Sequence, residues 1–189
     1  MLAQRLLRGM LAPAISRARS FGRDERGVTA IEFGILAIPF FVLIYAILET
    51  AMLFFASQVL DSAVEDASRK IRTGQAQAAS WTISNFRTEL CGYTFGMFGD
   101  CSNVQIKVAV LANFSAASTV PTVQNCTTAT CTWDPAFQSY AAGVRREVIQ
   151  VQAFYRWPLL VILPYFNLRN QPDNYRLISA MRVFRNEPF

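Results

Sequence analysis

The sequence predicts an α+β protein in which one long N-terminal transmembrane helix continues into a small antiparallel-sheet domain outside the membrane. Two observations carry this prediction. Residues 33–48 form an apolar run without a charged residue, and three stretches in the second half of the chain alternate apolar with polar residues. We therefore divide the 189-residue chain into a leader at 1–27, a transmembrane and amphipathic helix at 28–74, and an α+β domain at 75–189.

The leader is basic. It holds six arginines against Asp24 and Glu25, a net charge of +4 out of +5 for the whole chain. Because so little charge remains elsewhere, we expect no nucleic-acid partner. Arginines ahead of a membrane span keep that end of the chain in the cytoplasm, so we interpret the leader as a cytoplasmic tail that sets the topology. A removable leader is compatible with this interpretation, whereas a secretory signal fits poorly because the apolar run is too long.

The apolar run is long enough to cross a membrane. From Phe33 to Leu60 the only charged residue is Glu49, and these 28 residues extend about 42 Å at about 1.5 Å per residue, against a hydrocarbon core of about 30 Å. A buried core helix is the alternative, but the run is long for so small a chain. We expect one helix over residues 29–73 that ends at Gly74. Beyond the span, its apolar residues recur on one face: Leu60, Ala63, Val64, Ala67 and Ile71.

Two carboxylates stand within or beside the apolar run. Glu32 precedes it and Glu49 follows its uninterrupted part. A carboxylate inside a bilayer costs several kcal/mol (about 2.5 or more), so it is usually paired, turned toward protein or functional. The alternative is that each lies among the lipid headgroups, Glu32 at the inner face and Glu49 at the outer face, and has no further role.

The composition argues against an enzyme. The chain contains no histidine, which removes histidine-based triads, histidine general bases and histidine metal ligands. A serine nucleophile with Lys70 or Lys107 as its base is formally open, but no recognisable motif surrounds either lysine. We expect no catalytic residue, no cofactor and no metal site.

The outer domain reads as one short helix and three strands. A helix is expected over residues 81–90. The stretches 104–114 and 149–157 alternate apolar and polar residues as half-buried strands do, and 175–184 is a weaker third strand. We expect these strands to form a meander packed on the second half of the long helix.

Two segments of the domain are predicted as irregular. Residues 158–168 are apolar with prolines near both ends, and read as a loop or a short helix because they are too few to span a membrane. The apolar stretch 157–166 is expected to lie in the core, or else to contact a partner. The Thr- and Ser-rich segment 115–132 gives no sign of order apart from its cysteines.

All four cysteines fall on the predicted outer side: Cys91, Cys101, Cys126 and Cys131. An even number in an oxidising compartment favours two disulfides, for which three pairings exist. We favour the two short loops, Cys91–Cys101 and Cys126–Cys131. A zinc site is the rival interpretation, but no C-x2-C spacing occurs and histidine is absent.

The junction between leader and helix resembles the processing site of type IV prepilins. Arg26-Gly27-Val28-Thr29-Ala30-Ile31-Glu32-Phe33 places an acid five residues after a glycine that follows a basic leader. This resemblance implies that a prepilin peptidase cleaves after Gly27, which makes Val28 the new N-terminus. A glycine lets a protease approach the scissile backbone closely. A buried Glu32 needs a cation, and the new α-amino group of a neighbouring subunit supplies one.

Residues 27–74 resemble the TadE-like family of Flp (tight adherence, Tad) pilus assembly proteins. The family signature corresponds to Ala30, Glu32, Phe33, Pro39 and Glu49, and the C-terminal residues 185–189 also resemble endings seen in these proteins. The resemblance implies a pilin-like fold and a minor pseudopilin or assembly component, because the major Flp pilins are much shorter. Glu32 and Glu49 are then candidate subunit or partner contacts.

The resemblance also implies a location and partners. The chain is expected in the bacterial inner membrane as a single-pass protein, with its N-terminus in the cytoplasm and its C-terminal domain in the periplasm, and as a candidate for entry into the pilus. The expected partners are the prepilin peptidase and other Tad/Flp components, namely pilin, pseudopilins and platform proteins. The alternative is an uncleaved bitopic scaffold or binding module of the cell envelope.

Overall fold

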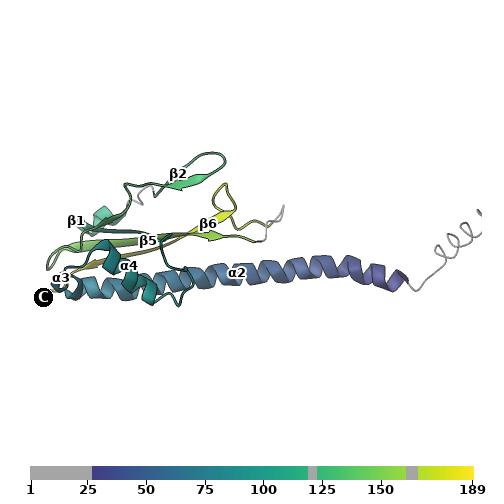
Figure 1. Cartoon of the computed structure of the whole chain (residues 1–189), viewed down its shortest axis with the longest axis horizontal. Coiled ribbons are helices and arrows are strands. Elements are labelled where there is room, and N and C mark those ends of the chain that lie inside the picture. Colours follow the sequence, from purple (N-terminus) through teal and green to yellow (C-terminus); the bar gives the residue numbers. More distant parts are fainter. Residues whose placement is uncertain (1–26, 119–122, 161–165) are drawn as a thin grey trace, which may run out of the picture. The chain divides into compact units, whose positions relative to one another are not determined.

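The structure is a computed structural model that describes residues 27–118, 123–160 and 166–189. The leader up to residue 26 therefore lies outside the described residues, as do the middle parts of the two segments predicted as irregular. The described chain forms a long helix, α2, followed by a small domain of strands and short helices (Figure 1). This is the α+β class predicted from the sequence.

Helix α2 spans Val28–Arg72 and continues through Pro39. Its bounds agree with the predicted helix over residues 29–73 to within one residue at each end. Among the described residues it is the one helix that is long and apolar enough to cross a membrane. The chain divides into two compact units, Met1–Tyr45 and Ala46–Phe189, and α2 contributes residues to both.

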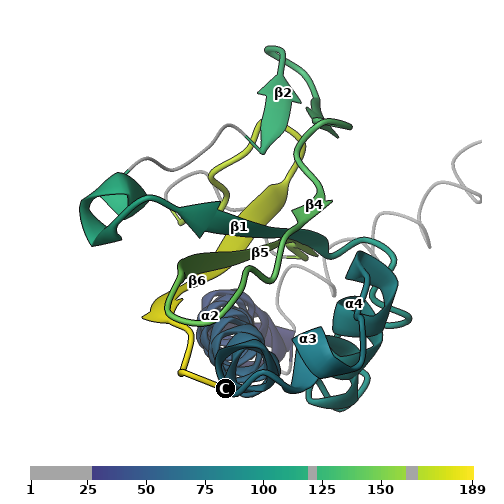
Figure 2. The ribbon, with the colours of Figure 1, turned by 90° about the vertical axis from the view of Figure 1, so that its left-hand side faces the viewer.

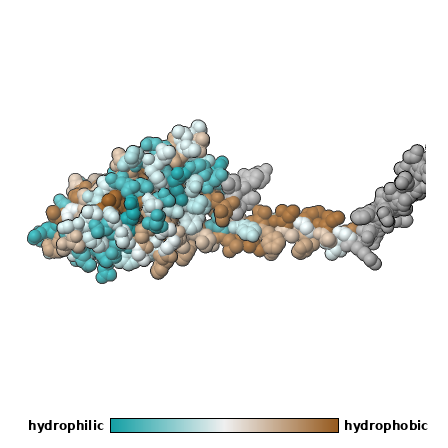
Figure 3. Space-filling model, in the orientation of Figure 1, coloured by the Kyte–Doolittle hydropathy of each residue, from teal (hydrophilic) through white to brown (hydrophobic). Residues whose placement is uncertain are grey.

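In the first unit, the described part of α2 exposes large apolar side chains. Ile31, Phe33, Leu36 and Ile38 are each 64–71% exposed. Figure 3 shows this part of the helix as a hydrophobic surface. Such a surface on a helix is stable in lipid or against other apolar helices, not in water.

In the second unit, α2 buries a stripe of small and branched residues against the domain. The five residues predicted to share one face are all buried, Leu60 and Ile71 completely. They pack with side chains from the sheet in the main hydrophobic core. Small residues such as Ala63 and Ala67 let the sheet approach the helix closely. The apolar face predicted for this part of α2 is therefore the face on which the sheet packs.

The domain is built on a four-stranded sheet in the order β4-β1-β5-β6. Strand β1 (Gln105–Leu111) pairs antiparallel with β5 (Val148–Pro158), which pairs antiparallel with β6 (Tyr175–Arg185). These are the three predicted strands in the predicted meander order. The prediction of a purely antiparallel sheet was wrong at one edge, because the two-residue strand β4 (Ser139–Tyr140) pairs parallel with β1.

The alternation of the strands sorts their side chains between two faces. Ile106 and Val108 of β1, Val151 of β5 and Ala180 of β6 belong to the core shared with α2. The opposite face carries glutamines, of which Gln152 is buried and donates a side-chain amide N–H toward the sulfur of Met181. Period-two patterning therefore directs the apolar face onto the helix.

Two short helices lie beside α2, below the β4 and β1 side of the sheet in Figure 2. Helix α3 is Gln75–Ala78 and helix α4 is Ile83–Gly92, which lies two residues later than the predicted 81–90. The shift has a local cause, because Thr82 and Asn85 form a capping box that fixes the first turn of α4.

The segment 115–132 is more ordered than predicted. The 3-10 helix η2 covers Phe114–Ser118, and β2 (Gln124–Cys126) pairs with β3 (Cys131–Trp133) in a separate two-stranded sheet. The buried side chains of Val123, Phe137 and Phe154 join this hairpin to the main sheet in a second, smaller core. Strands of three residues are too short to show a period in the sequence, which explains the miss.

The apolar stretch 157–166 divides between core and surface. Trp157 is partly buried and packs against the main core, Leu159 is buried, and Leu160 is 90% exposed. Its remaining residues up to 165 lie outside the described residues. Leu159 therefore agrees with the expectation that this stretch lies in the core, whereas Leu160 does not; the alternative of a partner contact stays a prediction.

The C-terminal tail is fastened to the end of α2 (Figure 2). The backbone N–H of Glu187 donates to the carbonyl of Arg72 at 2.9 Å. Gly74 follows in the left-handed region with φ +80°, and the ring of Phe189 occupies the place where a Cβ would lie. Glycine is needed here both for the backbone conformation and for the close approach of the ring.

A buried asparagine holds the base of this tail. Asn186 is 2% exposed. Its side-chain amide donates hydrogen bonds of 3.0 Å to the carbonyls of Ala142 and Val144, and its backbone N–H donates to the carbonyl of Glu147 at 2.9 Å. The terminal residues singled out in the sequence are therefore part of the packed domain.

Candidate functional site

The junction at Gly27 is open in the structure. Gly27 is the first described residue, and α2 begins at the next position, Val28. A Cβ added to Gly27 meets no atom within 4 Å. Neither packing nor a left-handed backbone conformation within the described residues therefore demands a glycine at this position.

Glu32 lies in the second turn of α2 and is exposed. It makes no hydrogen bond or ion pair with the part of the chain that the structure describes, and its neighbours Ile31 and Phe33 are exposed apolar residues. A carboxylate on an otherwise apolar helix gains most from a cation or a hydrogen-bond donor on another molecule.

Glu49 is in a different situation. It is 9% exposed, and the backbone N–H of Leu160, just beyond the end of β5, donates a hydrogen bond to its Oε1. Glu49 therefore lies against its own domain and is satisfied at least in part there. The structure does not bring the two carboxylates together, since they are 17 positions apart on α2.

Both disulfides join the short loops. Cys91 is bonded to Cys101 and Cys126 to Cys131, with Cα–Cα separations of 6.1 and 4.1 Å. The first closes the loop after α4, and the second closes the β2–β3 hairpin. This is the pairing favoured from the sequence, and each bridge closes a short loop of the domain.

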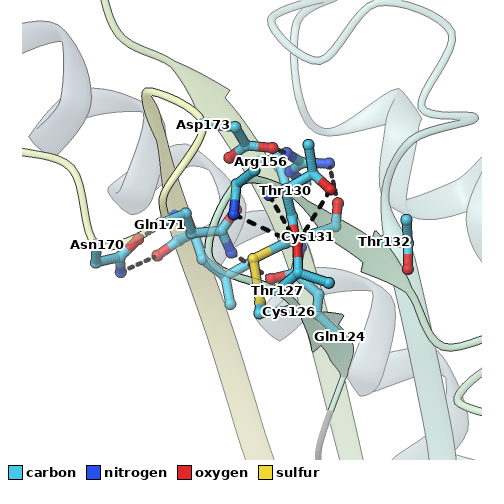
Figure 4. A network of polar contacts seen from close by, with 12 residues as sticks. Gln124, Cys126, Thr127, Thr130, Cys131, Thr132, Arg156, Asn170, Gln171 and Asp173 are labelled. Atoms are coloured by element: carbon cyan, nitrogen blue, oxygen red, sulfur yellow. Dashed lines mark hydrogen bonds and ion pairs between the residues drawn. A yellow bond between two sulfur atoms is a disulfide. The ribbon is translucent and has the colours of Figure 1, made fainter.

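An arginine that the sequence analysis did not single out fastens the hairpin to the sheet (Figure 4). The Nη1 of Arg156 donates to the carbonyl of Cys131 at 2.9 Å, and its Nη2 pairs with Asp173. Its guanidinium also lies 4.5 Å from the ring centre of Tyr175 and 6.0 Å from that of Trp133. One cation thus ties β3, β5 and the segment before β6 together.

Ion pairs connect α2 to the domain, and two groups of them involve Arg182 and Lys70. Arg182 of β6 binds the carboxylates of Asp61 and Glu65 on α2, and the hydrogen bond with Asp61 raises the pKa of Arg182. Lys70 pairs with Glu89 of α4 at 2.5 Å. The hydrogen bond from Lys70, and next that from Tyr93, lowers the pKa of Glu89 below its ordinary value.

Sequence reasoning had no way to find these partners. Arg182 and Asp61 are 121 positions apart, and Leu160 and Glu49 are 111 positions apart. The only local sign was that Arg182 is a charged residue at an inward position of the alternating strand 175–184, where an apolar residue is expected.

One family model, described as TadE-like protein, matches residues 27–69. The chain carries a TadE-like segment. This segment begins at Gly27, includes Glu32 and Glu49, and ends three residues before the end of α2. No curated protein and no solved structure matches the chain. The TadE-like family associates the protein with the Tad pilus, and the long apolar helix fits a membrane-anchored protein.

Proposed function

We propose that the protein is a minor pseudopilin of a Flp/Tad type IV pilus system, processed by prepilin peptidase after Gly27. The observation that carries the proposal is the arrangement at the start of the TadE-like segment. Helix α2 begins at Val28, directly after a glycine without packing contacts, and the fifth residue from Val28 is the exposed Glu32. Cleavage after Gly27 leaves an α-amino group at the first residue of an apolar helix.

Glu32 is the subunit contact in this proposal. Its carboxylate has no partner among the described residues, and the α-amino group of a neighbouring copy or of a pilin is a cation of the right kind. In a low-dielectric environment the ion pair between the Glu32 carboxylate and this α-amino group is favourable only if the two groups are well aligned. The pair would therefore fix the register between the helices of neighbouring subunits. Glu49 is a weaker candidate for a partner contact because Leu160 already binds its carboxylate.

The proposal includes a topology. The basic leader stays in the cytoplasm, residues from Phe33 onward cross the inner membrane, and the domain with both disulfides lies in the periplasm. Two disulfides and the absence of other cysteines support an oxidising compartment for the domain. The partners are then the peptidase in the membrane and other pilus components.

A complementation experiment tests this role. A strain that lacks the gene is given the wild-type gene, Glu32→Ala or Glu32→Asp, and surface pili are counted by electron microscopy after the amount of each protein is matched. We expect Glu32→Ala to abolish pili and Glu32→Asp to restore part of them. Asp66→Ala is the control, since Asp66 is an exposed carboxylate of the same helix outside the span. Normal piliation with Glu32→Ala refutes the role of Glu32.

The alternative is an uncleaved, bitopic scaffold or binding module. One observation favours it, because Glu49 shows that this chain can satisfy a carboxylate of the apolar run within its own domain. In that case the leader is retained and Glu32 lies among the inner headgroups. The two proposals predict different N-terminal residues for the protein in the membrane: Val28 for the processed pseudopilin, and Met1 for the uncleaved scaffold.

A further inference from the structure

A cleft of about 560 Å³ separates the end of α2 from the end of β6. Its helical wall consists of residues three or four positions apart on one face of α2, among them Ser68, Arg69 and Arg72. Its other wall is the consecutive stretch 182–184 of β6, and Glu187 of the C-terminal tail closes one end. Glu65, Ser68 and Arg69 lie within the TadE-like segment 27–69, and the other lining residues lie outside it.

The β6 wall is the open edge of the sheet. In the order β4-β1-β5-β6, strand β6 has a partner on one side only. Alternate backbone N–H and C=O groups along an edge strand face away from the sheet and can pair with another strand. At Leu177 the side chain of Asn170 already pairs with both backbone groups, and the carbonyl of Met181 accepts a hydrogen bond from Nη1 of Arg182. The stretch 182–184 has no such cover among the described residues, and there the cleft leaves room for a short extended chain.

The helical wall supplies positive charge. Arg69 is exposed and makes no hydrogen bond or ion pair through its side chain with the described residues. Arg72 has a side chain that is 54% exposed and lies 3.4 Å from Glu187, a long ion pair that another carboxylate can share. Arg182 is different, since Asp61 and Glu65 already neutralise it. Among the described residues, the cations of the cleft that can accept another carboxylate are therefore Arg69, which has no ion pair, and Arg72, whose ion pair with Glu187 is long.

A buried polar group in this wall lacks a partner. Ser68 is 3% exposed, lines the cleft, and its hydroxyl has no hydrogen-bond partner in the described part of the chain. A buried hydroxyl without a partner costs about 1–3 kcal/mol. A ligand whose hydrogen-bond acceptor reaches the Ser68 hydroxyl would remove this free-energy cost.

We propose that the cleft binds an extended, acidic peptide segment of a partner protein, which adds a strand to β6 and places its carboxylates at Arg69 and Arg72. The edge of β6 selects a peptide, because a phosphate or a lipid headgroup has no row of backbone groups to pair with it. The two acidic residues in the cleft, Glu65 and Glu187, disfavour a densely charged polyanion such as a nucleic acid. The proposal does not depend on cleavage after Gly27.

The test uses the full chain in detergent micelles and a displayed library of random dodecapeptides as the probe. We expect the library to become enriched in sequences with two acidic residues at alternate positions, since these lie on one face of a strand. The best peptide is then synthesised with and without N-methyl groups on alternate amides. N-methylation of the amides that face β6 is expected to abolish binding, because it removes the donors that pair with the edge.

Charge-reversal variants locate the site. Arg69→Glu should weaken the binding of the selected peptide at least tenfold, and Arg69→Glu with Arg72→Glu should abolish it. Arg169→Glu is the matched control, because Arg169 is an exposed arginine in the segment before β6 and does not line the cleft. Arg69→Ala serves as the conservative variant, since this side chain has no contacts to lose, and thermal unfolding confirms that each variant is folded. The proposal is overturned if acidic sequences are not enriched, if Arg69→Glu binds the peptide as tightly as wild type, or if the N-methylated peptides bind unchanged.

Discussion

The backbone N–H of Leu160 donates a hydrogen bond to the carboxylate of Glu49, which joins the end of β5 to α2. This contact turns one of the two carboxylates of the apolar run toward the domain and leaves Glu32 as the exposed one. The two glutamates of the TadE-like segment therefore lie in different environments. Glu49 is held against its own domain, and Glu32 is exposed.

Replacement of Glu49 should show whether its carboxylate stabilises the domain or contacts a partner. Glu49→Leu leaves the N–H of Leu160 without its acceptor, and we expect the free energy of unfolding to fall by about 1–3 kcal/mol. Glu49→Gln keeps an acceptor oxygen and should cost less. Thermal unfolding of the full chain in micelles, together with the exchange rate of the Leu160 amide, measures both. If Glu49→Gln leaves stability and amide exchange unchanged but abolishes pili, Glu49 acts on a partner instead.

Gly74 should be intolerant of any side chain. Gly74→Ala forces a Cβ into the ring of Phe189 and requires a left-handed conformation, so we expect a loss of about 2–4 kcal/mol. Gly92→Ala is the control, because nothing lies within 4 Å of its added Cβ and the residue is helical; it should be neutral or slightly stabilising. Equal thermal midpoints for the two variants contradict the close approach of Phe189 to Gly74.

The two disulfides should contribute comparable amounts to stability. The loops of 10 and 5 residues correspond to about 2–3 kcal/mol each on the chain-entropy estimate. We expect Cys126→Ser with Cys131→Ser to loosen the β2–β3 hairpin while the main core stays folded. Hydrogen exchange should show faster exchange in residues 124–133 and unchanged exchange in β5. Unfolding of the whole domain by this double variant contradicts a local role.

The Lys70–Glu89 pair should give the domain a pH dependence. The pKa of Glu89 is lowered in the folded state, so its contribution is present above the ordinary glutamate pKa of about 4.3 and is lost as pH falls through the lowered value. The pKa of Lys70 is raised, so its contribution is lost only when pH rises above about 10.4. Between these limits Glu89→Gln should unfold at a lower temperature than wild type, and the difference should vanish in acid. A constant difference down to low pH contradicts the ion pair.

The sequence predicts the elements whose pattern repeats over many residues. The apolar run and the buried stripe from Leu60 to Ile71 specify α2, and the alternation specifies β1, β5 and β6. The β2–β3 hairpin is missed because three residues show no period, and β4 because its pairing depends on where the loop returns. Long-range polar contacts are missed for a different reason, since nothing near Glu49 indicates that Leu160 will reach it.

The candidate functional residues also differ in whether the sequence alone reveals them. Gly27, Val28 and Glu32 are singled out from their order along the chain, because the proposed processing site is a local sequence feature. The cleft between α2 and β6 follows only from the fold, since it joins residues near 70 to residues near 183. Two of its arginines, Arg69 and Arg72, lie in the last turn of α2, where basic residues are common because they interact favourably with the helix dipole.

The central claim is that the chain is cut after Gly27, and the N-terminal residue tests it most directly. We would measure the intact mass and the N-terminal residue of the protein recovered from membranes, with a Gly27→Arg variant alongside. The account predicts that the wild-type protein begins at Val28 and that the variant retains its leader. A wild-type protein that still carries residues 1–27 contradicts the claim and leaves a permanent membrane anchor, with the link to the pilus resting on the TadE-like segment alone.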